Sequence, residues 1–164
     1  MNQHVENSSY RERLLEHLFI GELLKLSWKS GSCILEISKP EVDRSGYDVV
    51  AEANGIIRHI QLKTTFTGSS TISQKVHVSL GSKPSGCVVL INFEKESLGL
   101  DPFLFFGGAP GTPLPSLACH KVAKHNKGDA QGIKAERPNI RIVPNSHFTR
   151  IGTIEQLYVQ LFGA

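Results

Sequence analysis

Three polar residues on two neighbouring segments have the types and spacing that metal-dependent hydrolysis needs. Asp48 begins an apolar, β-branched segment over 47–53, and Gln61 and Lys63 lie in a second one over 56–65. Side chains alternate along a strand, so Gln61 and Lys63 point to the same face. Oxygen ligands suit a hard divalent cation, and a lysine beside a water can move a proton or neutralise developing charge. The trio therefore predicts hydrolysis of a phosphodiester bond.

The expected metal ligands are all oxygen atoms. Asp48 would be the anionic ligand, and the Gln61 side-chain oxygen and the Leu62 backbone carbonyl would complete the share of the protein. The dipeptide Asn54-Gly55 between the two segments is a strong signal for a tight β-hairpin. Such a hairpin would place the Asp48 carboxylate beside Gln61.

A helix expected over 10–28 would bring a further acid to this hairpin. Its apolar residues at helical spacing are Leu15, Leu18, Phe19 and Leu26. Glu22 falls among them in projection, where a carboxylate is costly unless it is paired or binds a metal. We therefore expect Glu22 to reach the metal through water. Glu16 and Glu12 lie toward the border of the same face and are weaker candidates, of which Glu16 is kept as a second catalytic acid.

The other expected elements are short strands, loops and a closing helix. Apolar or alternating residues predict strands over 33–38, 76–80, 87–93, 101–106 and 139–143. The continuous apolar run at 87–93 is typical of a strand buried on both faces, with 101–106 as its hairpin partner. Residues 107–115 are expected to form an ordered loop, and 154–162 a helix.

Composition narrows the class of protein. The chain has 164 residues with 40% hydrophobic residues, which suits one globular domain. No apolar run is long enough to span a bilayer, and the N-terminus has no basic start followed by an apolar stretch. A cytoplasmic protein without membrane contact is therefore expected. The three cysteines form no C-x-x-C pair, which argues against a zinc or redox motif.

Positive charge is concentrated toward the C-terminus. Residues 119–164 contain seven Lys and Arg against three Asp and Glu. A basic segment of this kind suits contact with the phosphate backbone of a nucleic acid, and the alternative is a solvated basic face. The expected nucleic-acid-binding residues are Lys121, Lys124, Lys127, Lys134, Arg137 and Arg141. His120 and His125 are interpreted as part of this basic patch rather than as metal ligands.

These motifs resemble the restriction-endonuclease-like superfamily, written PD-(D/E)XK. Those nucleases share an α-β-β-β-α-β core. Its first helix carries a Glu, its second strand carries an Asp, and its third strand carries an acid-x-Lys motif. Here Gly46-Tyr47-Asp48-Val49-Val50 and Gln61-Leu62-Lys63 match that order. The separation of 13 residues between Asp48 and Gln61 is similar to that in archaeal Holliday-junction resolvases. Gln61 replaces the usual acid, and a Gln-x-Lys version occurs in several nuclease branches and in bacterial domains.

The resemblance implies an α/β fold with a mixed central β-sheet flanked by helices. One domain would span 1–164, with a nuclease-like core at about 10–93 and a basic extension with the closing helix at about 100–164. It implies an Mg²⁺- or Mn²⁺-dependent endonuclease acting on DNA, and a homodimer is compatible with it. The implied catalytic residues are Glu22, Asp48, Gln61, Lys63 and Glu16. The implied metal ligands are Asp48, Gln61, Leu62 and Glu22.

Two alternatives stay open. The first is a non-catalytic module that binds nucleic acid or protein on a degenerate nuclease fold, because Gln61 leaves the site one negative charge short. The second is RNA rather than DNA as substrate, since no residue pattern reads a 2′-hydroxyl or a base edge.

Asp43 is interpreted as a loop residue that could help to orient the site.

Overall fold

The structure of the chain is a computed structural model that describes residues 3–42 and 44–164. Asp43, the loop residue considered above, lies outside the described residues. Within the described residues, none of the helices has both the length and the apolar character that a membrane span requires.

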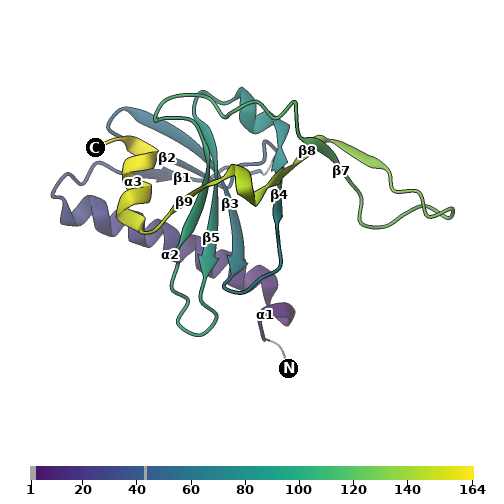
Figure 1. Cartoon of the computed structure of the whole chain (residues 1–164). Helices are drawn as coiled ribbons and strands as arrows, with labels where there is room; N and C mark the ends of the chain where they lie inside the picture. The colour runs from purple at the N-terminus through teal and green to yellow at the C-terminus, as the bar shows by residue number, and fades with distance from the viewer. Residues whose placement is uncertain (1–2, 43) are drawn as a thin grey trace.

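A six-stranded sheet forms the centre of the molecule (Figure 1), and its mixed character agrees with the prediction from the sequence. Its strands follow the order β1-β2-β3-β5-β6-β9, and all neighbours are antiparallel except β3 and β5, which are parallel. The bounds are Glu36–Ser38 for β1, Val49–Ala53 for β2, Ile56–Phe66 for β3, Gly86–Phe93 for β5, Phe103–Gly107 for β6 and Thr149–Ile151 for β9.

Helices cover one face of this sheet. Helix α2 spans Ser8–Lys29 after a short α1 at Gln3–Glu6, and α3 spans Ile154–Phe162. Leu15, Phe19 and Leu23 recur every four residues along α2 and are fully buried against the sheet. Leu18, which its helical spacing predicts to lie on the apolar face, is instead 36% exposed. The buried stripe is therefore rotated away from the expected one.

A second, three-stranded sheet lies against the other face. Its order is β4-β8-β7, with bounds Ser73–His77, Glu136–Pro144 and Lys121–Lys124. Val76 and Val143 from this sheet pack on Val88 and Leu90 of β5. Because Val89 and Ile91 face the helices, β5 is buried on both faces as predicted. The end of the β7–β8 hairpin projects from the body as an arm (Figure 1).

The connection between the parallel strands β3 and β5 differs from the expected core. The resemblance implies a helix there, whereas the structure has β4 followed by a 3₁₀ turn, η1, over Val78–Ser82. The strand predicted over 76–80 is thus only partly correct. It ends at His77 because the His77 ring accepts the Ser79 N–H at 3.2 Å, and Ser79 Oγ donates to the Ser45 carbonyl at 2.8 Å.

A fully buried arginine ties α3 to the central sheet. Arg58 of β3 is 0% exposed, and its guanidinium donates to the carbonyls of Gln160 and Leu161 at 3.1 and 2.9 Å. It also donates to the Gly108 carbonyl at 3.0 Å. These helix carbonyls lack partners within α3, so a cation at this end satisfies them and complements the helix dipole.

Replacing Arg58 should destabilise the fold strongly. In Arg58→Met the three carbonyls lose their donor, and we expect a loss of about 2–4 kcal/mol in the free energy of unfolding. Urea unfolding followed by circular dichroism measures this change. Arg150→Met, at an exposed position on β9, is the control and should stay within about 0.5 kcal/mol of the original protein. Equal stability of the two variants would contradict the anchoring role.

The three cysteines should differ sharply in reactivity. Burial raises the pKa of the Cys87 thiol to about 12, whereas Cys33 and Cys119 are exposed. The thiolate is the reactive form, so Cys87 stays protonated and unreactive at pH 8. Titration with Ellman's reagent should therefore count two thiols in the native protein and three in urea. Three fast thiols in the native protein would contradict the burial of Cys87.

Candidate functional site

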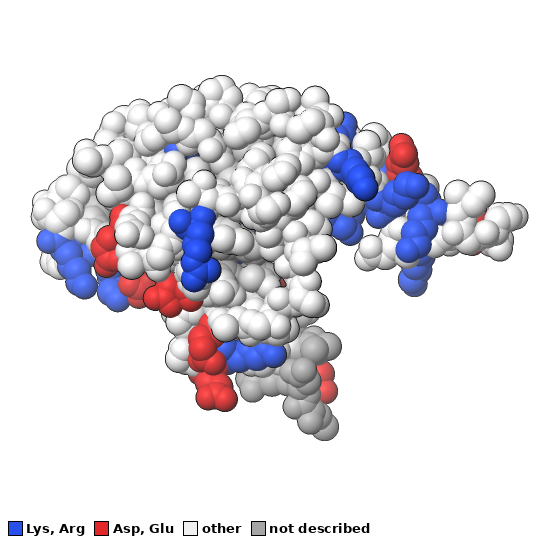
Figure 2. Space-filling view, viewed as in Figure 1, with Lys and Arg blue, Asp and Glu red and all other residues white. Residues whose placement is uncertain are grey.

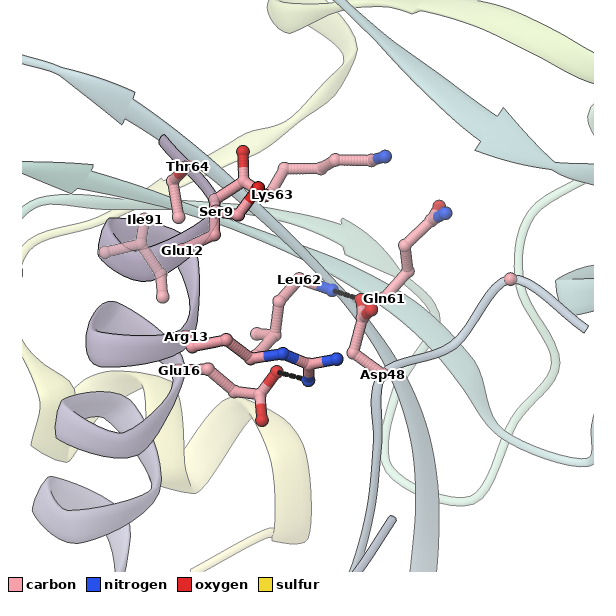
Figure 3. A pocket seen from close by; sticks show the side chains of 11 residues that line it. Ser9, Glu12, Arg13, Glu16, Asp48, Gln61, Leu62, Lys63, Thr64 and Ile91 are labelled. Carbon is pink, nitrogen blue, oxygen red and sulfur yellow. Dashed lines mark hydrogen bonds and ion pairs between the residues drawn. The ribbon is translucent and has the colours of Figure 1, made fainter. Parts of the chain in front are cut away.

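A cavity of about 520 Å³ lies where β3 continues beyond the start of β2. Its floor is the Gln61-Leu62-Lys63 stretch of β3, and the first two turns of α2 form the opposite wall (Figure 3). The residues that line it are Ser9, Glu12, Arg13, Glu16, Gly46, Asp48, Gln61, Leu62, Lys63, Thr64 and Ile91. The cavity therefore contains four of the five expected catalytic residues.

The hairpin places Asp48 as the sequence predicts. Asn54 and Gly55 adopt φ angles of 53° and 72°, the left-handed conformation that a tight hairpin turn requires. The register pairs Val49 with Ile60, and the Asp48 N–H donates to the Ile60 carbonyl at 2.9 Å. Asp48 Oδ2 then accepts the Leu62 N–H at 2.7 Å (Figure 3). The carboxylate is thus held at the edge of β3.

Gln61 provides an oxygen that lacks a partner among the described residues. Its side chain is 8% exposed, and Oε1 is buried without a hydrogen-bond donor in the described part of the chain. A buried carbonyl oxygen without a partner costs about 1–3 kcal/mol. Gln61 and Lys63 extend in the same direction, away from α2 (Figure 3). Such an oxygen, on a residue that lines the same cavity as Asp48, has the chemistry of a cation ligand.

The first turns of α2 contribute Glu16 and Glu12 to the cavity. Glu16 is 7% exposed, accepts a hydrogen bond from Arg13 Nη1 at 3.2 Å and forms an ion pair with Lys39. Glu12 is exposed. Both helix acids therefore line the cavity, and the buried one, Glu16, has its charge balanced by two cations.

Glu22 does not reach this cavity, which corrects the expectation from the helical periodicity. It lies on a separate cavity with Leu98 and Asp101, and it forms an exposed ion pair with Lys25 at 2.8 Å. The predicted apolar stripe included Leu18, which is 36% exposed. The stripe was therefore expected too close to Glu22 on the helix surface. The position of Glu22, six residues beyond Glu16, also places it about 9 Å farther along the helix axis.

The site offers few anionic side chains as ligands for a metal ion. Within residues 3–42 and 44–164, no three His, Cys, Asp or Glu side chains are grouped as metal ligands. A cation at Asp48 would therefore depend on the neutral oxygens of Gln61 and Leu62. Hard cations such as Mg²⁺ accept carbonyl oxygens and retain waters, so this donor set fits one.

The expected nucleic-acid-binding residues lie on or beside the projecting arm. Lys121 and Lys124 are the ends of β7, Arg137 and Arg141 belong to β8, and Lys127 and Lys134 lie in the connecting loop. Figure 2 shows Lys and Arg side chains gathered at the base of the arm and along it. Of the six, Arg137 also lines a small cavity next to the candidate site.

The histidines of this region have separate surroundings. His120 Nε2 lies 3.0 Å from His147 Nδ1, and the His120 ring packs edge-on against Phe106. His125 lines a different cavity, together with Glu136 and Arg137. The two histidines that are close in the sequence are thus engaged with different neighbours.

Three residues beside the site carry no sequence motif. Arg44, Lys75 and His77 line the small cavity with Gln61 and Lys63, and they come from the loop before β2 and from β4. Only the folding of β4 and β8 over β3 brings them together.

Comparisons of the chain with known protein families, with curated proteins and with solved structures found no match.

Proposed function

We propose that this protein is a metal-dependent nuclease that hydrolyses phosphodiester bonds, with DNA as the favoured substrate. The observation that carries the proposal is the buried Gln61 Oε1, which has no hydrogen-bond partner among the described residues and belongs to a residue that lines the same cavity as Asp48 and Lys63. A carboxylate, a neutral oxygen and an ammonium group at one open strand edge are the groups that such a hydrolysis needs.

Each residue of the cavity has a distinct role in this proposal. Asp48, the Gln61 side-chain oxygen and the Leu62 carbonyl would hold Mg²⁺ or Mn²⁺. When bound, the cation would polarise the phosphoryl oxygens and lower the pKa of a coordinated water. Lys63 would orient the attacking water and neutralise charge that develops on the phosphate. Glu16 and Glu12 would accept hydrogen bonds from waters on the α2 side of the cavity.

The order of elements supports a restriction-endonuclease-like core. Helix α2 is followed by β1, β2 and β3, with Asp48 immediately before the second strand and Gln61-x-Lys63 on the third. This is the order that the resemblance implies. The β4–η1 connection, in place of a helix, departs from it.

The basic arm favours a nucleic acid as the substrate. Its Lys and Arg residues match no pattern that recognises bases. They would therefore contact phosphates without distinguishing one nucleotide sequence from another. The small cavity that includes Arg137 connects this basic surface to Gln61 and Lys63.

A second candidate function is a non-catalytic nucleic-acid-binding module. The observation that favours it is the pairing of Glu16, the buried acid of the cavity, with both Arg13 and Lys39, which balances its charge within the protein. In this case the basic surface would bind nucleic acid and the cavity would remain inert.

Three substitutions distinguish these functions. Asp48→Ala should abolish metal-dependent cleavage and leave DNA binding intact or stronger, because a negative charge near phosphate is lost. Lys63→Ala should lower the cleavage rate by roughly 10²–10⁴. Gln61→Glu should tighten Mn²⁺ binding, because a carboxylate replaces a neutral ligand.

The measurements are cleavage of duplex, single-stranded, branched and RNA substrates, and calorimetric titration with Mn²⁺. Equal Mn²⁺ affinity in the original protein, Asp48→Ala and Gln61→Glu would reject the metal site and favour the binding module.

The arm can be tested through the salt dependence of binding. Each phosphate neutralised on duplex DNA contributes about 0.9 to the slope of log affinity against log salt concentration. Replacing Lys121, Lys124 and Lys127 together by Ala should flatten that slope by up to about three units. Fluorescence anisotropy at several salt concentrations measures the slope. An unchanged slope would assign these lysines to a solvated surface without a role in binding.

A further inference from the structure

A second cavity adjoins the candidate site on the opposite face of β3. Its volume is about 290 Å³, and it shares Gly46, Gln61 and Lys63 with the first cavity. Strands β4 and β8 and the loop before β2 supply the rest of the lining, which consists of Arg44, Lys75, His77, Arg137 and Ile140. The two cavities therefore meet at Gln61 and Lys63.

The lining of this second cavity is cationic. It contains Arg44, Lys63, Lys75 and Arg137, and neither Asp nor Glu is among its described lining residues. The ion pairs found in the described part of the chain join Arg13, Lys25 and Lys39 to glutamates, so Arg44, Lys75 and Arg137 are not paired with a described carboxylate. Among the described residues, the Lys75 ammonium donates a hydrogen bond to the neutral Asn126 Oδ1 at 3.4 Å. Several cations around one cavity repel one another and attract an anion.

The wall of the cavity is fixed by close packing. Gly46 has φ of +71°, and a Cβ at this position would overlap His77 Cβ and lie 2.8 Å from His77 Cγ. His77 Nδ1 contacts Ser79 Oγ at 2.6 Å as well as the Ser79 N–H. Nδ1 is thus engaged inside the protein, whereas Nε2 forms no hydrogen bond with a described residue and is available to a ligand. The cationic groups thus surround a closely packed wall, which suits the binding of an anion.

We propose that Arg44, Lys75, His77 and Arg137 bind a phosphate of the nucleic-acid strand that neighbours the phosphate to be cleaved. The inference rests on the proposed function, because it places the scissile phosphate at Asp48, Gln61 and Lys63. Guanidinium groups pair with phosphate oxygens through two parallel hydrogen bonds, and Lys75 adds a point charge. A strand that crosses the open edge of β3 would reach both cavities, and the basic arm continues the same surface.

A phosphate held here would position the strand without taking part in the reaction. Its loss should therefore weaken binding and raise KM, and leave kcat nearly unchanged. This split separates the second cavity from the first, where Lys63 is expected to affect the rate.

The test uses Lys75→Gln and Arg137→Gln, with Arg150→Gln as the matched control. Arg150 is an exposed residue of β9, at the other edge of the six-stranded sheet from β1. The probe is a fluorescein-labelled single-stranded DNA of 12 nucleotides, in EDTA so that no cleavage occurs. Each test variant should bind roughly tenfold more weakly and lose about 0.7 from the salt slope, and Arg150→Gln should match the original protein. With Mg²⁺, KM should rise by a similar factor and kcat should stay within about twofold.

The outcomes separate this inference from the proposed function. Equal binding by Lys75→Gln, Arg137→Gln and the original protein overturns the second site, even when the protein cleaves DNA. Weaker binding by both variants in EDTA supports the second site, and absence of cleavage by the original protein then overturns only the nuclease. Inorganic phosphate is a second probe, followed by NMR at the Gly46 and His77 amides. If phosphate shifts these signals and the DNA does not, the cavity is a site for free phosphate and the inference fails.

Discussion

The hydrogen bond from the Leu62 N–H to the Asp48 carboxylate fixes the geometry on which the candidate site depends. Strand β2 begins at Val49, one residue after Asp48, while β3 continues to Phe66. An open strand edge normally presents unpaired amides, and here a side chain satisfies the first of them. The bond holds the carboxylate at the point where the two strands part, next to the Gln61 side chain. Asp48 therefore ends the pairing of β2 with β3, and its own carboxylate is the acid that is positioned there.

The alternation of β3 around this point separates two surfaces of different charge. Leu62 faces α2, where Glu12 and Glu16 line the first cavity, and Gln61 and Lys63 face the second sheet, where Arg44, Lys75 and Arg137 gather. Gln61 belongs to both surfaces. A glutamate here would bring a negative charge into the basic cavity and would pair with its cations. Under the proposed function, a neutral glutamine would supply a ligand oxygen and leave those cations for a phosphate, which would give the departure from the acid-x-Lys pattern a physical reason.

Local patterns predicted the elements whose neighbours are close in sequence. The hairpin between Asp48 and Gln61 follows from the Asn54-Gly55 turn, and the closing helix at 154–162 agrees with α3, because both depend on short-range signals. Glu22 was expected at the hairpin but lies on another cavity, because apolar periodicity does not distinguish a leucine that is 36% exposed, such as Leu18, from a buried one. Arg58 was missed for the opposite reason. Its burial depends on the carbonyls of Gln160 and Leu161, about one hundred residues away, which no local pattern reveals.

The connection between β3 and β5 accounts for the basic cavity. A parallel pair of strands needs a crossover, and a helix in this position would cover the sheet with its own side chains. Strand β4 instead pairs with β8, which carries Arg137 and Arg141 and continues into the projecting arm. The same strand carries Lys75 and His77 to the face of β3 that Gln61 and Lys63 occupy. The strand in this connection, where the resemblance implies a helix, thus joins the arm to the candidate site, because the two share one small sheet.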